Sequence, residues 1–321
     1  MRRVLRLLLA LVPILLIAAL IVIFGILPYG VARSIAHTLT HPARAPITRT
    51  PTDVGITEWT TVRLDAPDGI QLVGWFIPPP LTTANGTPSD GTALLYLHGF
   101  GGNRQSMLFQ AAVLYRQGYG ALLIDQRAHG ESGGELSTLG YLEMGDASIM
   151  IDFLLNEPSV NPKKIGILGE SMGAVVALLS ASHRANDVRA VIAQSPYASV
   201  EGAIDQATRR NAGIVALTLV PLARMAIQTE IGVDPAAINP LEQIYWISPR
   251  GLLLMHGDLD PVVAPINSQQ LYDAARTPRE LVFFANGGHG GLIEDDPALW
   301  ARRVTAFLAR YLRDDPIEDG A

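Results

Sequence analysis

The chain has 321 residues, a formal net charge of −6 and no cysteine, and 49% of its residues are hydrophobic. This composition is typical of a large buried core, and it excludes a disordered chain, disulfide bonds, thiolate metal sites and a cysteine nucleophile. The first fifty residues carry six arginines and no carboxylate, so the remainder has a net charge of −12, which argues against nucleic acid as a partner.

The first predicted element is an apolar helix. Residues 7–27 include no charged side chain, and at about 1.5 Å per residue a helix of that length spans roughly 30 Å, enough to cross a bilayer. Three arginines precede this stretch, which favours a cytoplasmic N-terminus and an extracytoplasmic catalytic domain. Gly30 and Ala32 leave a cleaved signal peptide as the alternative. We therefore predict a single-pass membrane anchor over residues 1–30.

The next segment, residues 31–56, has scattered prolines, arginines and histidines without apolar periodicity, which predicts a linker. His37 and His41 lie in it at a spacing of four, which is also the spacing of a metal pair on a helix. No helix and no carboxylate partner is predicted beside them. We interpret them as solvated linker histidines and predict no metal site.

Beyond the linker, short apolar runs alternate with stretches typical of helices. The first two runs flank the turn at residues 67–69 and suit an antiparallel hairpin, whereas the other six are apolar throughout, as in strands buried on both faces. This alternation predicts an α/β fold, with an eight-stranded, mostly parallel sheet and helices on both faces. The strands are predicted at residues 60–64, 70–77, 94–97, 121–125, 165–168, 190–193, 252–255 and 281–284, and the helices at 106–117, 140–156, 172–183, 265–275 and 297–312.

One connection is longer than a helical crossover requires, because roughly 55 residues separate the sixth strand from the seventh. Its apolar stretch at 214–227 is short and is interrupted by Pro221 and Arg224, so a second membrane span is not expected. We predict a helical lid insertion over about residues 199–248, with a long surface excursion as the alternative. The predicted α/β domain then covers residues 57–314, followed by an acidic tail at 315–321.

The strongest chemical signal is the pattern G-E-S-M-G at residues 169–173, between a predicted buried strand and a predicted helix. Small residues on either side of the serine let the strand and the helix approach closely, and the turn projects the Ser171 hydroxyl above the sheet. A neutral serine needs a base to accept its proton and a third group to orient that base. We therefore predict that Ser171 is a nucleophile.

Two later strand ends offer the base and the acid. H-G-D-L-D at residues 256–260 follows the seventh strand, and His289 lies in a glycine-rich loop after the eighth. Because parallel strands end at one edge of a sheet, both loops are expected to meet the Ser171 turn. The order along the chain is then nucleophile, acid and base. The remaining domain histidines, His98, His129 and His256, are expected to serve packing or turn hydrogen bonds.

Three further motifs accompany this order. H-G-F-G-G stands at residues 98–102, D-Q-R-A-H-G-E-S at 125–132 and H-G-D-L-D at 256–260. Together they make residues 58–312 resemble the α/β-hydrolase superfamily, whose oxyanion loop, D-x-R-x-H-G-x-S segment and acid loop they match. The resemblance implies Asp260 as the acid, with Asp258 as the alternative, and the backbone N–H groups of Phe100 and Met172 as oxyanion donors. No cofactor is implied.

The expected function is that of a serine hydrolase that forms an acyl-enzyme on Ser171 and releases it with water activated by His289. A small uncharged, apolar ester is the expected substrate, bound by the domain that the N-terminal helix holds at the membrane. One alternative is a serine peptidase or amidase, for which Glu170 and Glu131 would recognise a free amine. A second is a non-enzymatic membrane receptor or scaffold, a class that typically lacks a member of the triad.

Overall fold

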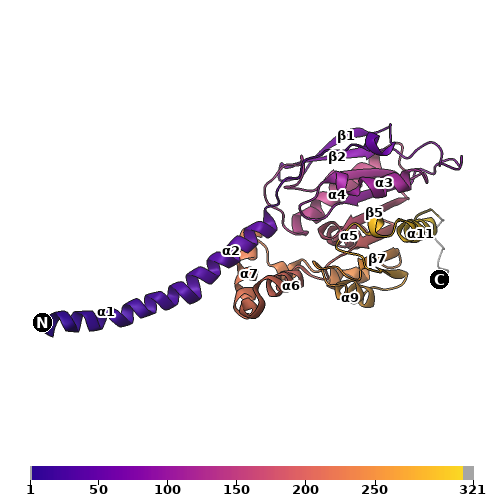
Figure 1. Ribbon diagram of the computed structural model, residues 1–321. Coiled ribbons are helices and arrows are strands. Elements are labelled where there is room, and N and C mark those ends of the chain that lie inside the picture. Colours follow the sequence, from indigo (N-terminus) through magenta and orange to yellow (C-terminus); the bar gives the residue numbers. More distant parts are fainter. Residues whose placement is uncertain (1, 314–321) are drawn as a thin grey trace.

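In the computed structural model the described part of the chain is residues 2–313, with the side chains of residues 2–10, 24, 211, 212 and 214 excepted. Figure 1 shows a central twisted sheet between helices, and a long N-terminal helix that projects from this body. The predicted acidic tail at 315–321 lies outside the described residues.

The sheet has eight strands in the order β1-β2-β4-β3-β5-β6-β7-β8. Strands β1 and β2 form an antiparallel hairpin, β2 is antiparallel to β4, and every other pairing is parallel. The predicted α/β fold with an eight-stranded, mostly parallel sheet is therefore confirmed. The strands are β1 (Thr60–Asp65), β2 (Gln71–Ile77), β3 (Ala93–Leu97), β4 (Gly120–Asp125), β5 (Ile165–Glu170), β6 (Ala190–Gln194), β7 (Gly251–Gly257) and β8 (Arg279–Phe284).

Helices cover both faces of this sheet (Figure 1). Side chains alternate along a strand, so in β3 Leu95 and Leu97 face one apolar cluster and Leu94 and Tyr96 face another. Helices α4, α5 and α9 complete the first cluster, and α3 and α11 complete the second. These helices are α3 (Leu108–Tyr115), α4 (Tyr141–Asn156), α5 (Met172–His183), α9 (Ile266–Ala274) and α11 (Pro297–Leu308), with the short α10 (Leu292–Asp295) before the last.

The long connection after β6 is helical, as the sequence predicts. It forms α6 (Val200–Ala212), α7 (Ala216–Ile231) and the single turn α8 (Pro240–Gln243). Gly232 ends α7 in a left-handed conformation, as expected at a helix C-terminus. Buried Ile204 and Ile227 of these helices join Val175 and Leu179 of α5 in a third apolar cluster. We refer to residues 199–248 as the helical insertion.

The N-terminal region differs from the prediction. Helix α1 (Arg2–Ile21) continues through a π-turn into α2 (Leu27–Thr40), where an irregular linker is predicted. Ala32 and Ala36 of α2 are fully buried in the third apolar cluster, against the insertion. Alanine is small and favours helix, so α2 packs closely on α7. Among the residues searched, those that the structure describes, no helix is long and apolar enough to cross a membrane.

Candidate active site

Ser171 lies in the turn between β5 and α5 with φ of 53° and ψ of −116°, a backbone conformation that is rare for a residue with a side chain. The two glycines of the motif are required by close approach. A Cβ on Gly169 would lie 2.2 Å from the Gly173 carbonyl oxygen, and a Cβ on Gly173 would lie 2.1 Å from that of Leu97. The G-E-S-M-G turn therefore has the strained geometry that its sequence predicts.

The three predicted residues meet at the carboxyl edge of the sheet. The distance between Ser171 Oγ and His289 Nε2 is 2.9 Å, and that between His289 Nδ1 and Asp260 Oδ2 is 2.7 Å. A carboxylate accepts only, so Nδ1 carries the proton and Nε2 presents a lone pair to the serine hydroxyl. The chain of contacts has the direction that proton removal from Ser171 requires.

The two candidate acids, Asp260 and Asp258, differ in burial. Asp260 is buried and Asp258 is exposed. Burial alone would raise the pKa of Asp260, but hydrogen bonds from His256, from His289 and from the Val263 N–H outweigh it and hold that pKa well below its ordinary value. Asp260 therefore remains a carboxylate at neutral pH, so its charge can stabilise a protonated His289.

His256 makes a contact that the sequence did not predict. Its Nε2 lies 2.9 Å from the Val263 carbonyl oxygen and 3.1 Å from Asp260 Oδ2, so this nitrogen carries a proton that it shares between two acceptors. Its Nδ1 lies 2.7 Å from Ser268 Oγ. His256 thus contacts the same carboxylate oxygen of Asp260 as His289 does. The sequence predicts packing or turn hydrogen bonds for His256, and the structure adds this contact to the Asp260 carboxylate.

The loop after β3 passes directly beside the nucleophile, because a Cβ on Gly99 would lie 3.3 Å from that of Ser171. His98 is fully buried, its Nδ1 lies 2.7 Å from the Gly99 carbonyl oxygen, and its Nε2 accepts from the Gln126 N–H at 3.1 Å. A trans peptide points its C=O and N–H in opposite directions, so His98 also fixes the direction of the Phe100 N–H.

Met172 is the first residue of α5, and the N–H of that position has no acceptor within the helix. It follows Ser171 directly, at the positive end of the helix. The half-buried Phe100 ring packs edge-on against His129, with ring centroids 5.4 Å apart. Both residues predicted as oxyanion donors therefore lie beside the Ser171 turn.

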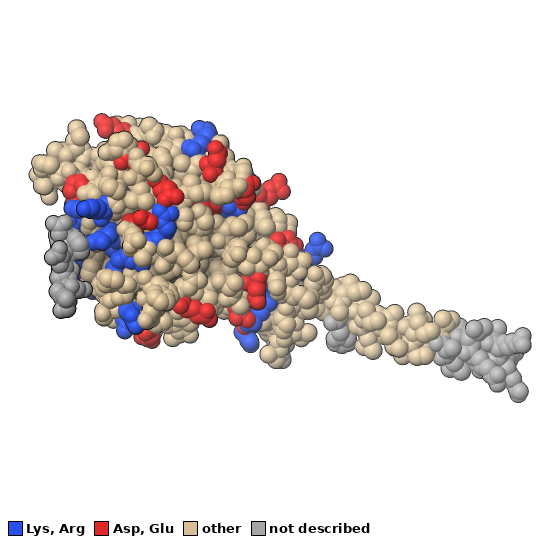
Figure 2. Space-filling view, turned by 180° about the vertical axis from the view of Figure 1, so that it is seen from behind, with Lys and Arg blue, Asp and Glu red and all other residues tan. Residues whose placement is uncertain are grey.

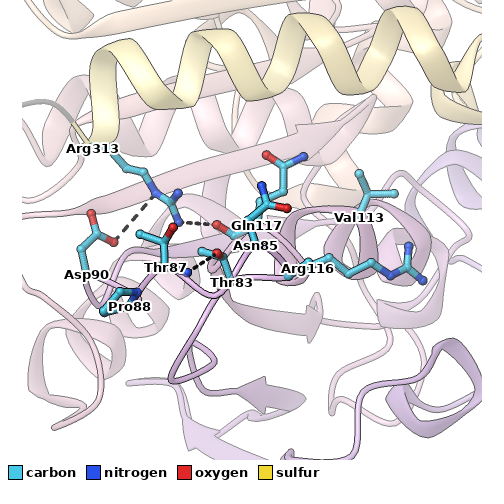
Figure 3. Close-up of a pocket in the computed structure, with 10 residues that line it drawn as sticks. Thr83, Asn85, Thr87, Pro88, Asp90, Val113, Arg116, Gln117 and Arg313 are labelled. Atoms are coloured by element: carbon cyan, nitrogen blue, oxygen red, sulfur yellow. Dashed lines mark hydrogen bonds and ion pairs between the residues drawn. The ribbon is translucent and has the colours of Figure 1, made fainter.

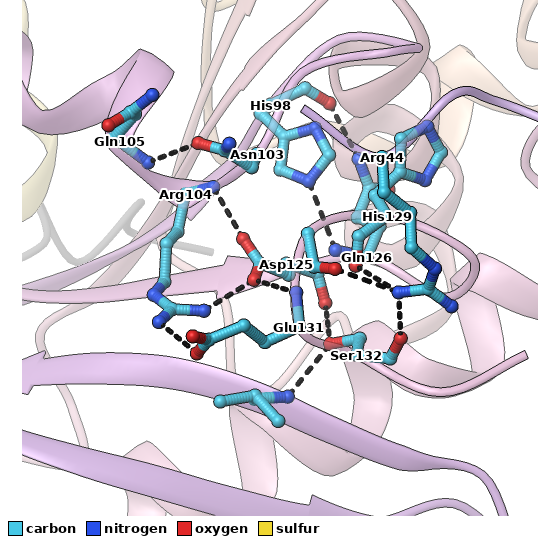
Figure 4. Close-up of polar contacts among 12 residues, drawn as sticks. Arg44, His98, Asn103, Arg104, Gln105, Asp125, Gln126, His129, Glu131 and Ser132 are labelled. Atoms are coloured by element: carbon cyan, nitrogen blue, oxygen red, sulfur yellow. Dashed lines mark hydrogen bonds and ion pairs between the residues drawn. The ribbon is translucent and has the colours of Figure 1, made fainter. Parts of the chain in front are cut away.

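The segment at residues 125–132 forms a buried polar network (Figure 4). The Asp125 carboxylate accepts from the backbone N–H of Arg104 at 2.6 Å and of Glu131 at 2.8 Å, and it pairs with the Arg104 guanidinium. A Cβ on Gly130 would collide with Asp125 at 2.2 Å, which explains a glycine there. The network fixes the loop against which Phe100 packs.

Arg44, from the segment predicted as a linker, donates to four backbone carbonyls of this same region. Its guanidinium contacts the oxygens of His129 at 3.4 Å, Gly130 at 2.8 Å, Ser132 at 2.6 Å and Gly134 at 2.6 Å (Figure 4). Nothing local signals this contact, because the partners lie 85 to 90 residues further along the chain.

The acidic pair suggested for amine recognition has other partners. Glu131 forms an ion pair with Arg104 at 2.5 Å. Glu170 accepts from the Gly291 N–H at 3.2 Å, in the loop that carries His289, and burial raises its pKa. The contacts among described residues therefore assign Glu131 to the polar network and Glu170 to the base loop.

The helical insertion reaches the acid loop. Arg210 of α6 donates to the carbonyls of Pro261 and Val262, and Val263 belongs to the third apolar cluster. A surface cavity of about 810 Å³ lies elsewhere, between residues 83–90, the end of α3 and Arg313 (Figure 3). Asp90 comes just before β3, so this cavity is at the amino edge of the parallel strands, away from Ser171.

Comparison with known proteins agrees with this fold. The chain is 27% identical to the uncharacterized protein YfhR of Salmonella typhimurium over 79% of this chain and 77% of that protein. The esterase Pf2001 of Pyrococcus furiosus has a TM-score of 0.69 at 26% identity, over 86% of this chain and 99% of the esterase chain.

A third relative shares the fold. The α/β hydrolase GrgF of Penicillium has a TM-score of 0.62 at 21% identity, over 80% of this chain and all of that one. Residues 105–315 match the Prolyl oligopeptidase family, about two thirds of the chain. The fold, the site and these matches identify a serine hydrolase of the α/β-hydrolase superfamily, and the chain belongs to the prolyl oligopeptidase family.

Proposed function

We propose that the protein hydrolyses carboxylic esters through an acyl-enzyme on Ser171. The observation that carries the proposal is the chain of contacts from Ser171 Oγ through His289 to Asp260, at 2.9 and 2.7 Å. Ser171 Oγ attacks the ester carbonyl carbon while His289 Nε2 accepts its proton. His289 then gives this proton to the leaving alcohol. Water, deprotonated by the same nitrogen, releases the acid from the enzyme.

The negative oxygen of each tetrahedral intermediate is stabilised by the backbone N–H groups of Phe100 and Met172. Two features support this role: His98 fixes the peptide that precedes Phe100, and Met172 stands at the N-terminus of α5. Donors placed before the reaction need no reorganisation as charge develops. Loss of one such donor typically costs about a hundredfold to a thousandfold in kcat.

An ester substrate is favoured over a peptide by two observations. The relative named an esterase, Pf2001, is 26% identical to this chain, and the match covers 99% of the esterase chain. In an aminopeptidase, Glu131 would have to bind the free amine of the substrate. It is instead paired with Arg104. The family match favours peptidase or amidase action as the second candidate, with the same three residues. A receptor or scaffold role is less favoured because nucleophile, base and acid are in hydrogen-bonding contact.

The helical insertion acts as a lid in this proposal and selects uncharged, apolar acyl groups. Its contact with the acid loop supports a position near Ser171, and Val215, Leu217 and Met225 leave apolar side chains exposed on it. Each methylene buried against such a surface is worth about 0.8 kcal/mol. Catalytic efficiency should then rise up to about fourfold per methylene until the acyl site is full.

The test is fluorophosphonate labelling of the full-length protein in mild detergent, followed by p-nitrophenyl esters of two to twelve carbons beside aminoacyl nitroanilides. We expect labelling that Ser171→Ala abolishes, and faster turnover of the esters. Labelling that persists in folded Ser171→Ala protein contradicts the nucleophile. Faster turnover of the anilides selects the peptidase candidate, and the absence of any turnover or labelling leaves the non-enzymatic role.

Attachment to a membrane is a separate proposal. The described side chains of the projecting helix are apolar and exposed, among them Ile14, Leu15 and Leu16, and Figure 2 shows them as a surface without charge beside a body that carries both signs. We expect the chain to stay with membranes after carbonate extraction, and external protease to reach the hydrolytic domain. A processed chain that begins near Arg33 would instead indicate a cleaved signal.

A further inference from the structure

Helices α2 and α7 bring two imidazoles and a carboxylate together at one end of their contact. His37 belongs to the last turn of α2, His41 follows as its C-terminal cap, and Glu230 lies in the last turn of α7. One ligand atom from each lies within 4.8 Å of the others. The helix and the carboxylate, which the sequence did not place beside these histidines, are both present.

The hydrogen bonds around His41 select its tautomer. Thr40 Oγ1 donates its only proton to the Ala36 carbonyl at 2.9 Å, so it has only lone pairs left for His41 Nδ1, which lies 3.0 Å away. Nδ1 must therefore carry the proton of the neutral ring, and Nε2 has a free lone pair. A second hydrogen bond that fixes one ring nitrogen while the other binds is the usual arrangement of a metal-ligating histidine.

The supporting elements are rigidly packed. Ala32, Ala36 and Thr40 of α2 are fully buried, and Ile227 of α7 lies in the same apolar cluster as the two alanines. The rings of His37 and His41 stack with centroids 3.9 Å apart, so the two imidazoles already lie side by side. The side chains of exposed His37 and of the partly buried His41 and Glu230 have to shift for the three ligand atoms to converge.

We propose that His37, His41 and Glu230 bind a Zn²⁺ ion, with water as the fourth ligand. Imidazole nitrogen and carboxylate oxygen are both ligands that zinc takes readily, at about 2.0–2.2 Å in tetrahedral geometry. Ligand atoms around such an ion are roughly 3.3–3.6 Å apart, so the present separations require closure by little more than about 1 Å. Rotation of the three side chains is enough for this.

Arg33 competes with the ion for the carboxylate. Its Nε lies 3.8 Å from Glu230 Oε1, and its side chain is 72% exposed whereas that of Glu230 is 19% exposed. An exposed ion pair of this kind contributes little stability, and the guanidinium can turn into solvent when zinc arrives. Removal of Arg33 should therefore tighten zinc binding, whereas removal of Glu230 should weaken it.

The bound ion would crosslink α2 to α7. Helix α2 continues from the apolar N-terminal segment, and α7 belongs to the helical insertion, which contacts the acid loop. Zinc would thus stiffen the join between the N-terminal helix and the insertion without contact to Ser171. This role is independent of the proposed ester hydrolysis.

The experiment uses the untagged full-length chain in detergent, titrated with ZnCl₂ by calorimetry and followed by thermal unfolding. We expect one equivalent of zinc to bind saturably and to raise the unfolding midpoint. His37→Ala and Glu230→Gln should each weaken binding at least about tenfold, and Arg33→Gln should strengthen it. His183→Ala is the matched control, because His183 is a surface histidine outside the cluster that contacts Gln243.

Ser171→Ala protein should bind zinc as the wild type does, which keeps this result separate from the fate of the catalytic proposal. The site is overturned if the wild type shows no saturable binding of one equivalent, or if its affinity equals that of the folded His37→Ala variant. It is also overturned if Glu230→Gln and Arg33→Gln change the affinity in the same direction, because the carboxylate would then act only in its ion pair.

Discussion

Asp260 has its carboxylate between two imidazoles and two backbone N–H groups. His289 and His256 approach Oδ2 at 2.7 and 3.1 Å, and the N–H groups of Val262 and Val263 donate to Oδ1 at 2.8 and 2.9 Å. Four donors around one buried anion fix both its charge and its direction. The base is therefore oriented by a group that has almost no freedom to turn.

The first prediction compares the two aspartates of the acid loop. Asp260→Asn places an amide against His289 Nδ1 and favours the wrong tautomer, so kcat should fall on the order of ten-thousandfold. Asp258→Asn is the matched control, because Asp258 is exposed and only its backbone N–H contacts Phe284. Ester kinetics of the two variants, with their folding checked by circular dichroism, give the answer. A larger loss in Asp258→Asn would mean that the acid is misassigned.

The second prediction concerns His98. Burial, together with the neighbouring His129, lowers the pKa of His98 to about 3, whereas an unfolded histidine titrates near 6.5. Below about pH 6.5 the unfolded state therefore binds a proton that the folded state does not, and stability falls as the pH falls. The slope from His98 is up to about 1.4 kcal/mol per pH unit between roughly pH 6.5 and 3.

His98→Gln tests this directly, because glutamine can keep both hydrogen bonds but has no proton to gain. Urea unfolding at pH 7, 6, 5 and 4 should show a shallower loss of stability in the variant than in the wild type. Parallel curves for the two proteins would show that His98 is not the linked group. Since glutamine can keep the hydrogen bond to the Gly99 carbonyl, kcat at pH 7 is expected to change little.

At the scale of the element, the β5–α5 turn and its two partner loops were predictable from sequence. Each is encoded by a few adjacent residues whose roles are local: glycines where backbones meet, a serine where strand becomes helix, an aspartate and a histidine just after strand ends. The parallel sheet then brings them together without further information. The alternation of apolar runs with helical stretches was enough to predict the sheet as well.

The N-terminal segment was not predictable in the same way. Arg44 acts through carbonyls more than 80 residues away, and the buried side chains of α2 pack with those of α7 more than 180 residues further along the chain. The role of His256 was missed for a related reason. Its ring contacts Asp260 because the loop at residues 256–263 folds back on itself. No residue type in that loop predicts this conformation.

The third prediction belongs to this segment. Arg44→Met removes the guanidinium hydrogen bonds to four backbone carbonyls between residues 129 and 134, so the loop behind Phe100 loosens. We expect kcat to fall about threefold to tenfold with KM nearly unchanged, since small misplacements near a reacting group are costly. Arg49→Met is the control, because the contact of Arg49 to Gln105 is made by its backbone N–H. Equal kinetics in the two variants would show that Arg44 does not position the loop.

For the whole molecule, the contacts form one path from the N-terminal helix to the site. Helix α2 packs on α7, α7 packs on α6, and Arg210 of α6 contacts the acid loop. A second branch runs from Arg44 to the loop behind Phe100. Asn103, directly after the oxyanion loop, also donates to the Ala45 carbonyl at 3.0 Å. Residues 27–50 are thus part of the hydrolytic domain in structural terms.

The last prediction follows from these contacts. A chain shortened to begin at Leu27 keeps α2 and Arg44, whereas one that begins at Pro51 loses both and exposes the face of α7 around Ala223 and Ile227. Loss of the packed helix and of several charged hydrogen bonds should cost at least about 2–3 kcal/mol, which for a domain of this size lowers the unfolding midpoint by at least about 5 °C. The shorter chain should also self-associate in gel filtration through the exposed apolar face. If the two chains unfold at the same temperature and both remain monomeric, residues 27–50 are only a linker, and their contacts with the hydrolytic domain do not stabilise it.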